Sequence, residues 1–468
     1  MDFYGRVEEQ KSINYLLTQD NFASGIIYGR RRLGKTELLK QCFINSGKKF
    51  FIYQCNQENE KSNINDLTKL IKDTLNLKNI AFESFIEAVE FIFDYGIENE
   101  LLFAIDEYPY IRKIIDGIDS KLQRVIDNYQ NKSKIKFFLL GSSISTMEDI
   151  QSDKNPLYRR FNLSILLKEM DYYDSANFYK GFSNEDKVKL YAAFGGVPFY
   201  NKQVNPKLSV KDNIILLLSG QFSHLLDEIT TNMKEELNKI NNAYTVFSSI
   251  AEGAFHYSDI LSKSGINTSS SLYDTLEVLV KMDLIEYVCP INDKSNKKKS
   301  GYVLTDSAIY FYYRYIYHNL SIKNIMSNDS FYDKYISDDF YSVVVPKVFE
   351  KISKQYLIRM NKLGKIEPTI VEIGTYWYDN PKEKKNGQFD LVTKASDGYI
   401  VYEVKFTNSK IDNHIIKEEI EQVSNTNLNP VNYGFISKTG FNVTKPYDRY
   451  IFISLDDIYQ WFNNINNA

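Results

Sequence analysis

Apolar runs alternate with amphipathic stretches through the first third of the chain. The apolar runs predict strands at 25–29, 49–55, 101–106 and 136–142. Apolar positions at helical spacing predict helices near 35–46, 63–76, 82–96 and 119–130. An alternation of this kind predicts a parallel sheet with helices on both faces.

The middle of the chain has the pattern of consecutive helices. Residues 171–235 are predicted to be helical, with a break at Gly195-Gly196-Val197-Pro198. Three helices are predicted next, at 237–252, 256–264 and 268–283. Two short strands are predicted after them, at 285–291 and 301–306. This is the order of a winged helix. Residues 268–283 would then be its recognition helix, and the turn between the two strands would be its wing.

The charges of this segment leave its partner open. The wing holds four lysines, Lys294, Lys297, Lys298 and Lys299. Such a cluster predicts contacts with DNA phosphates. The predicted recognition helix holds three acids and one lysine, Asp274, Glu277, Asp283 and Lys281. Because these acids would repel a phosphate backbone, the pattern fits protein packing as well as DNA binding.

The last third returns to a mixture of strands and helices. Helices are predicted near 339–360 and 412–425. Strands are predicted near 370–377, 388–395, 399–407, 432–437 and 450–454. An aromatic stretch at 310–335 precedes them, and aromatic density of this kind predicts packing more often than base stacking. The tail is therefore expected to form a second α/β domain.

Bulk properties narrow the classes of function. A length of 468 residues predicts two to four domains. The formal net charge is −3, so contact with nucleic acid would need a local basic patch. Cys42, Cys55 and Cys289 lack metal-site spacing and fit a reducing cytoplasm. No apolar run approaches ~20 residues, which predicts a cytoplasmic protein without a membrane span.

One uninterrupted motif predicts nucleotide binding. Gly29-Arg30-Arg31-Arg32-Leu33-Gly34-Lys35-Thr36 satisfies G-x-x-x-x-G-K-[ST] between a predicted strand and a predicted helix. Glycines at both ends let the backbone turn and direct its N–H groups at phosphate oxygens. Lys35 is expected to reach the β- and γ-phosphates of ATP, and Thr36 to hold Mg²⁺.

A second element supports this site. Asp106 and Glu107 directly follow the apolar run 101–105. Because ligands of parallel sheets bind at the carboxyl ends of strands, Asp106 is a candidate Mg²⁺ ligand and Glu107 a candidate general base. Ser142 or Ser143, which end the strand at 136–142, are candidate sensors of the γ-phosphate. A cap at the strand end is the alternative for these serines.

The tail contains charged residues inside apolar strands. Glu403 and Lys405 are two positions apart and therefore share a strand face. The Asp397-Gly398 turn is expected to bring the strand of Asp390 alongside. Asp390 and Glu403 could hold Mg²⁺ beside Lys405, with Glu350 completing the metal site and Gln422 in contact with it. A buried structural ion pair is the alternative.

The first two thirds resemble the AAA+/STAND-like ATPases of archaea and bacteria. The carrying residues are Phe3-Tyr4-Gly5-Arg6 with Glu9, the phosphate loop, Ile105-Asp106-Glu107-Tyr108-Pro109-Tyr110, Leu140-Gly141-Ser142-Ser143 and Phe194-Gly195-Gly196-Val197-Pro198-Phe199-Tyr200. The resemblance implies that Tyr4-Gly5-Arg6 lies by the adenine and that the Gly-Gly-Val-Pro turn lies by the nucleotide in a helical lid.

One arginine is assigned by the same resemblance. Pro156-Leu157-Tyr158-Arg159-Arg160 is similar to the family's Pro-Leu-Tyr-Gly-Arg segment. Arg160 is then the candidate γ-phosphate arginine. Arg159 stands where the family has Gly, so the choice between the two arginines, and between action in cis and in trans, stays open.

The tail resembles the PD-(D/E)xK nuclease-like domain that often follows these ATPases. The match rests on Asp390 and Glu403-Val404-Lys405, and more weakly on Glu350 and Gln422. Phe389 stands where the family has Pro. The resemblance implies Mg²⁺-assisted phosphodiester hydrolysis, with Asp390, Glu403 and Lys405 as catalytic residues and Glu350, Asp390 and Glu403 as metal ligands.

These predictions combine into an α/β protein of five parts. They are a P-loop NTPase parallel-sheet core at 1–170, a helical lid at 171–235, a winged helix at 236–310, an aromatic connector at 311–338 and a restriction-endonuclease-like domain at 339–468. The predicted function is gating of the nuclease-like domain by the nucleotide state, with DNA as the expected nucleic acid. The alternative is a nucleotide-switched regulator whose tail binds DNA or protein without cutting. A homo-oligomer or a protein partner is left open.

Overall fold

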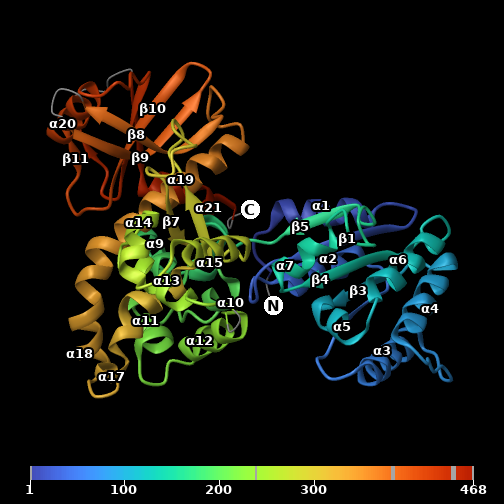
Figure 1. The fold of residues 1–468 in the computed structure, drawn as a ribbon. Helices are drawn as coiled ribbons and strands as arrows, with labels where there is room; N and C mark the ends of the chain where they lie inside the picture. The colour runs from blue at the N-terminus through green and yellow to red at the C-terminus, as the bar shows by residue number, and fades with distance from the viewer. Residues whose placement is uncertain (1–2, 238–239, 381–384, 444–448, 466–468) are drawn as a thin grey trace. The chain divides into compact units, whose positions relative to one another are not determined.

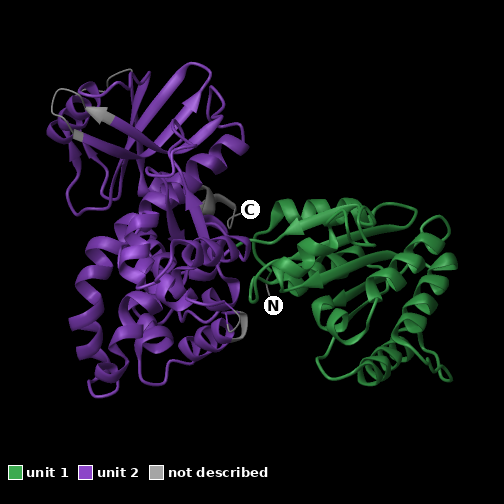
Figure 2. Ribbon diagram, in the orientation of Figure 1, with its two compact units in different colours: residues 1–169 green, residues 170–468 purple. Residues whose placement is uncertain are grey.

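The computed structural model of the chain describes residues 3–237, 240–380, 385–443 and 449–465. It divides into two compact units, residues 1–169 and 170–468 (Figure 2). Each unit has its own sheet and is described separately below.

The first unit is built on a five-stranded sheet in the order β2-β3-β4-β1-β5. The strands are β1 (Ala23–Tyr28), β2 (Phe50–Gln54), β3 (Leu102–Asp106), β4 (Lys136–Gly141) and β5 (Leu163–Leu166). All neighbouring pairs are parallel. The four predicted strands and the parallel sheet are confirmed. The short edge strand β5 was not predicted, because its alternating, partly exposed residues form no apolar run.

Helices cover this sheet because its central strands are apolar on both faces. Every residue of β1, β3 and β4 is buried, which is typical of a parallel sheet between helical layers. The helices are α1 (Val7–Leu17), α2 (Lys35–Ser46), α3 (Glu60–Leu75), α4 (Phe85–Glu98), α5 (Tyr108–Ile114), α6 (Ile118–Tyr129) and α7 (Ile144–Ile150) (Figure 1). The four predicted helices are confirmed as α2, α3, α4 and α6.

The second unit begins with short helices. They are α8 (Tyr172–Ser175), η1 (Ala176–Tyr179), α9 (Asn184–Phe194), α10 (Pro198–Asn201), α11 (Val210–Ile214), η2 (Ile215–Ser219) and α12 (His224–Leu237). The predicted break after residue 194 is confirmed. Gly195 has a positive φ of 63°, and a Cβ on Gly196 would lie 1.9 Å from the carbonyl oxygen of Met170. Only glycine fits this approach.

The predicted winged-helix order follows. It comprises α13 (Ala243–Ala251), α14 (Tyr257–Ser264), α15 (Ser269–Lys281), β6 (Ile285–Val288) and β7 (Gly301–Leu304). The two strands pair antiparallel. The Thr268 hydroxyl accepts the backbone N–H of Ser271 and caps α15, as its position before an apolar helix predicts.

An aromatic connector of short helices leads to the last domain. It contains α16 (Ser307–Phe311), η3 (Tyr312–Ile316), η4 (Tyr317–Asn319), α17 (Leu320–Lys323), α18 (Asn328–Tyr332), η5 (Asp333–Ser337) and η6 (Phe340–Val344). Phe311, Tyr313 and Tyr315 are buried. The predicted packing role of the aromatic stretch is confirmed.

The tail forms a mixed five-stranded sheet in the order β14-β12-β10-β9-β8. Its elements are α19 (Val345–Lys362), β8 (Glu372–Asn380), β9 (Lys385–Ala395), β10 (Gly398–Lys405), β11 (Ile411–Asp412), α20 (Asn413–Ser424), β12 (Asn432–Ser437), β13 (Phe441–Asn442), β14 (Tyr450–Ser454) and α21 (Leu455–Ile465). Strands β8, β9 and β10 pair antiparallel, whereas β10, β12 and β14 pair parallel. The predicted α/β tail is confirmed.

No helix in the described ranges has both the length and the apolar character needed to cross a membrane.

Candidate functional site

The phosphate loop connects β1 to α2 through positions that need glycine. Gly29 has a φ of +146°, and a Cβ there would lie 2.3 Å from the carbonyl oxygen of Leu167. Gly34 has a φ of +86° and is the N-cap of α2. The loop therefore leads straight to a helix N-terminus, which is the geometry that binds phosphate.

The last two residues of the loop motif, Lys35 and Thr36, carry its charged and hydroxyl groups. The buried Lys35 directs its ammonium group into the loop, where Nζ donates to the carbonyl oxygens of Gly29 and Arg30, each at 2.9 Å. The Thr36 hydroxyl donates to Asp106 Oδ2 at 2.6 Å. The predicted partners Thr36 and Asp106 thus meet, although they lie 70 positions apart.

The carboxyl ends of β3 and β4 complete this site. The backbone N–H of Glu107 donates to Asp106 Oδ1 at 2.8 Å. Glu107 Oε2 accepts the Ser142 hydroxyl at 2.8 Å and the Ser142 N–H at 3.3 Å. Burial raises the pKa of Asp106, and the Thr36 hydrogen bond offsets part of this rise. Asp106 and Glu107 therefore occupy distinct environments, one buried against Thr36 and the other held by Ser142.

The donor set at this site fits Mg²⁺. The Thr36 hydroxyl and the Asp106 carboxylate supply hard oxygen atoms, and protein-bound Mg²⁺ takes few protein ligands and fills its other positions with water and phosphate.

The arginines of the loop have partners within the first unit. Arg30 forms a buried ion pair with Glu169, and Arg31 donates to the Tyr110 hydroxyl at 2.9 Å. Arg6 of the family-like Tyr-Gly-Arg segment donates to the carbonyl oxygen of Leu33 at 3.4 Å. Glu169 was not predicted, because nothing in the local sequence connects it to a loop that lies 139 positions away.

Arg160 lies at the opposite edge of the sheet from the phosphate loop. Its backbone carbonyl accepts the Ser24 hydroxyl at 2.7 Å, where β1 begins, whereas the phosphate loop follows the end of β1. A strand of this length separates the two edges by roughly 16 Å. The guanidinium pairs with Asp127, with Nε to Oδ1 at 2.6 Å. Of the two routes left open for Arg160, this position favours action in trans over contact with a γ-phosphate bound by its own chain.

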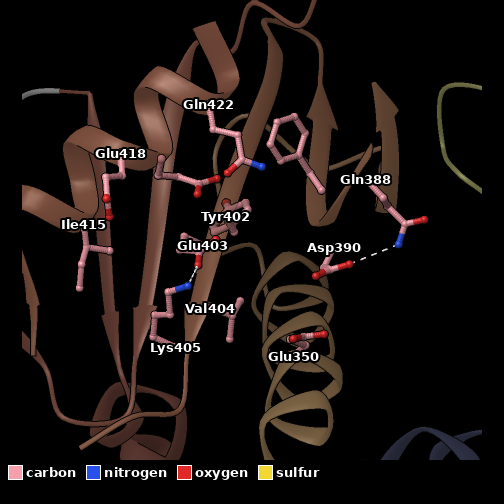
Figure 3. A pocket seen from close by; sticks show the side chains of 12 residues that line it. Glu350, Gln388, Asp390, Tyr402, Glu403, Val404, Lys405, Ile415, Glu418 and Gln422 are labelled. Atoms are coloured by element: carbon pink, nitrogen blue, oxygen red, sulfur yellow. Dashed lines mark hydrogen bonds and ion pairs between the residues drawn. The ribbon is translucent and has the colours of Figure 1, made fainter. Parts of the chain in front are cut away.

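The second candidate site is a pocket of about 520 Å³ in the tail (Figure 3). Its lining comes from α19, β9, β10 and α20: Glu350, Gln388, Phe389, Asp390, Tyr402, Glu403, Val404, Lys405, Ile415, Glu418, Glu419 and Gln422. It contains every tail residue predicted for the nuclease-like site. The antiparallel pairing of β9 and β10 runs as far as Tyr402 and Leu391. The next residues of the two strands, Glu403 and Asp390, both line the pocket.

Several polar side chains of this pocket form ion pairs or hydrogen bonds with a neighbouring side chain. Glu403 forms an ion pair with Lys405 (Figure 3). Gln388 Nε2 donates to Asp390 Oδ1 at 3.2 Å. Gln422, which lines the pocket as predicted, donates from Nε2 to the Tyr378 hydroxyl at 3.2 Å.

The pocket brings carboxyl groups together in two pairs. Burial and the Asp390 carboxylate raise the pKa of Glu350 to about 7. Burial and a hydrogen bond to Glu403 raise the pKa of Glu419. Glu419 was not predicted, because a glutamate on an amphipathic helix carries no signal that distinguishes it from the exposed acids beside it.

The predicted single metal-sized cluster is not found. Within the described ranges, no three His, Cys, Asp or Glu side chains lie close enough together to hold one ion. Glu350 and Asp390 approach each other from α19 and β9, whereas Glu403 pairs with Lys405 on β10 (Figure 3). The prediction that these residues line one pocket is correct. The prediction that they surround a single metal-sized site is wrong for the described residues.

These raised pKa values predict a pH-dependent stability. The folded state holds the Glu350 proton up to about pH 7, whereas the unfolded chain releases it near 4.5. The unfolding free energy should therefore fall by up to about 3 kcal/mol as the pH rises through this window. Thermal unfolding of the full chain in EDTA should show this slope, and Glu350→Gln should reduce it to the part that Glu419 contributes. The exposed Glu421→Gln variant serves as the control, and equal slopes in all three proteins would contradict the prediction.

Two of the wing lysines already have carboxylate partners. Lys294 pairs with Glu372 of β8, and Lys299 Nζ lies 3.0 Å from Asp293 Oδ2. Phosphate contact by these two lysines would therefore have to compete with the carboxylates, whereas no carboxylate pair is seen for Lys297 and Lys298 in the described part of the chain, and the DNA-binding role of the wing stays a prediction.

The sequence and the fold are similar to those of archaeal proteins. Residues 3–204 match the model of an ATPase domain found predominantly in Archaea, and residues 312–420 match that of archaeal and bacterial proteins of unknown function. An uncharacterized protein of Methanocaldococcus jannaschii is 29% identical over 377 residues, which are 80% of this chain and 82% of the relative.

Solved structures show similarity at lower identity. A Walker-type ATPase of Pyrococcus abyssi has a TM-score of 0.51 and 21% identity, covering 67% of this chain and 96% of its own. The ORC2 protein of Aeropyrum pernix has a TM-score of 0.42 and 12% identity, and the match covers 74% of this chain and 94% of the ORC2 chain. The first of these supports the fold. Together with the loop geometry, the family match identifies residues 3–204 as a P-loop ATPase domain.

Proposed function

We propose that this protein is a nucleotide-regulated, Mg²⁺-dependent nuclease. ATP binding and hydrolysis in the first unit would control phosphodiester hydrolysis in the tail, with DNA as the substrate. The observation that carries the nuclease assignment is the convergence of Asp390, Glu403 and Lys405 on one pocket. Buried or half-buried charges of this kind are costly unless they have partners or a function.

The nucleotide site offers groups for phosphate binding, Mg²⁺ binding and activation of the attacking water. The Lys35 ammonium would leave the loop carbonyls for the β- and γ-phosphates. Thr36 and Asp106 would hold Mg²⁺. Glu107 would orient and deprotonate the attacking water. Ser142 holds the Glu107 carboxylate and would report the presence of the γ-phosphate.

The tail pocket offers carboxylate oxygens as metal ligands and the ammonium group of Lys405 as a positive charge. Glu350 and Asp390 would hold Mg²⁺, and Glu403 would join them once its carboxylate turns away from Lys405. The ion, when bound, supplies Lewis-acid stabilisation and a more acidic water. Burial, and after it repulsion from Asp390, raises the pKa of Glu350. A bound cation would relieve the repulsion, which supports a cation at this place. Lys405 would stabilise the negative charge that develops on the phosphate.

A cleavage assay tests the proposal. The full chain is incubated with single-stranded DNA, double-stranded DNA or RNA, with Mg²⁺ or Mn²⁺, and with or without ATP. We expect metal-dependent cleavage that Glu403→Gln reduces by at least about 100-fold, as expected for loss of a principal charged group. Glu421→Gln, an equally conservative change on the exposed face of α20, should retain it. Cleavage that survives Glu403→Gln, or is absent from the wild type under every condition, would overturn the proposal.

The second candidate function is a nucleotide-switched regulator whose tail binds without cutting. The Glu403–Lys405 ion pair and the absence of a three-acid cluster in the described ranges favour it. ATP-dependent retention of intact DNA, or of a protein, by a non-cleaving wild type would support this alternative. A homo-oligomer belongs to either proposal, since Arg160 could reach a γ-phosphate only on another copy.

A further inference from the structure

The wing of the winged helix lies against the edge of the tail sheet. The backbone N–H of Ile291 donates to the carbonyl oxygen of Thr375 at 2.8 Å. The Asn292 side chain bonds both backbone groups of Trp377: Nδ2 donates to its carbonyl oxygen at 2.8 Å and Oδ1 accepts its N–H at 3.0 Å. The amide of Asn292 thus pairs with edge strand β8 as a neighbouring strand would.

Apolar and charged contacts reinforce this attachment. Ile291 packs against the cluster that contains Phe389 and Val392. Its Cγ2 lies so close to Gly374 that a Cβ there would be 3.1 Å away. Lys294 pairs with Glu372. Lys299 lies over the ring of Trp377, 5.2 Å from its centroid. The wing therefore contacts β8 through backbone, amide, apolar and charged groups.

The attached segment of β8 lies one strand away from the pocket. Tyr376 pairs with Phe389, and Trp377 pairs with Gln388. Phe389 and Gln388 line the pocket beside Asp390. A displacement of the wing would therefore pass through one pair of strands to the carboxylate that faces Glu350.

We infer that the wing is an internal docking element that controls the pocket through β8 and β9, and not a DNA-binding loop. When the winged helix moves, the wing shifts β8, β9 follows through the paired positions 376–389 and 377–388, and Asp390 changes its position relative to Glu350. The effect on cleavage rests on the proposed function; the coupling between wing and strand does not.

The test releases the wing with surface substitutions that leave the core intact. Asn292→Ala combined with Lys294→Ala removes the amide bridge and the ion pair. The exposed Lys298→Ala is the matched control on the same loop. The chain has two tryptophans, Trp377 and Trp461. Trp461→Phe is therefore introduced into every protein compared, so that the fluorescence comes from Trp377 alone. The full-length variants are compared by hydrogen exchange of the amides of 388–392, by acrylamide quenching of Trp377 and by ATP turnover.

In the double variant, we expect exchange over 388–392 to become about 10-fold faster, because opening free energies respond to each lost contact. Trp377 should become more accessible to acrylamide, and ATP turnover should stay within about 2-fold. The Lys298→Ala control should match the wild type. Unchanged exchange over 388–392 in the double variant overturns the inference, whether or not Trp377 becomes more accessible.

Cleavage adds a second readout that separates the two proposals. If the wild type cuts DNA, the double variant should cut about 10-fold more slowly, with Lys298→Ala unaffected. If the wild type does not cut, the proposed function fails, while the exchange result still decides whether the wing is coupled to β9. Slower cleavage in the control to the same degree would instead identify the wing as a substrate contact.

Discussion

Replacing Glu107 with glutamine should leave ATP binding intact and slow its hydrolysis by ~10²–10⁴-fold, the usual contribution of a general base. Glu107 lies at the carboxyl end of β3, beside the Asp106–Thr36 pair, and accepts hydrogen bonds from Ser142. Glutamine preserves the size and the Ser142 acceptor but cannot take a proton. The measurements are steady-state phosphate release and ATP affinity by calorimetry.

The matched control for this change is Glu90→Gln on the exposed face of α4, which should hydrolyse ATP at the wild-type rate. Turnover near the wild-type rate in Glu107→Gln would mean that Glu107 is structural or that another group orients the water. Ser142→Ala should give an intermediate rate, because it frees the carboxylate without removing it.

Replacing Lys35 with alanine should weaken ATP binding by about 100-fold or more, since charge-assisted contacts to two phosphates are lost. In the structure, Lys35 Nζ donates to the carbonyl oxygens of Gly29 and Arg30, which belong to the loop and not to the core of the unit. The fold should therefore survive the change. Calorimetry with ATP measures the affinity, and circular dichroism checks the fold.

Lys40→Ala, an exposed lysine on the same helix α2, is the control for loss of charge. It should bind ATP like the wild type. An unaltered ATP affinity in Lys35→Ala would remove the assignment of residues 29–36 as the phosphate loop.

The local sequence pattern was sufficient to predict most strands of the first sheet and the phosphate loop. The central strands of the first unit are buried on both faces, so each appears in the sequence as an uninterrupted apolar run. The phosphate loop needs only eight consecutive residues, and its glycines take the positive φ angles that the motif requires. The approach of Thr36 to Asp106 and of Ser142 to Glu107 could also be predicted, because parallel strands end at one edge.

Other elements carried too little local signal. The edge strand β5 is short and partly exposed. Glu419 is one of several acids on α20, and only its hydrogen bond to Glu403 in the folded chain distinguishes it. The pairing of Arg30 with Glu169 joins segments that no motif connects.

The sequence by itself therefore determined most of the strands and helices, the loop that has phosphate-binding geometry and most of the charged tail residues that share a pocket, because periodicity, backbone freedom and strand ends are local properties. Only the tertiary structure decided that Arg160 lies at the edge away from the phosphate loop, and that the wing binds β8. These outcomes depend on which surfaces meet after folding. A lysine-rich turn has the same local sequence whether phosphates or carboxylates become its partners.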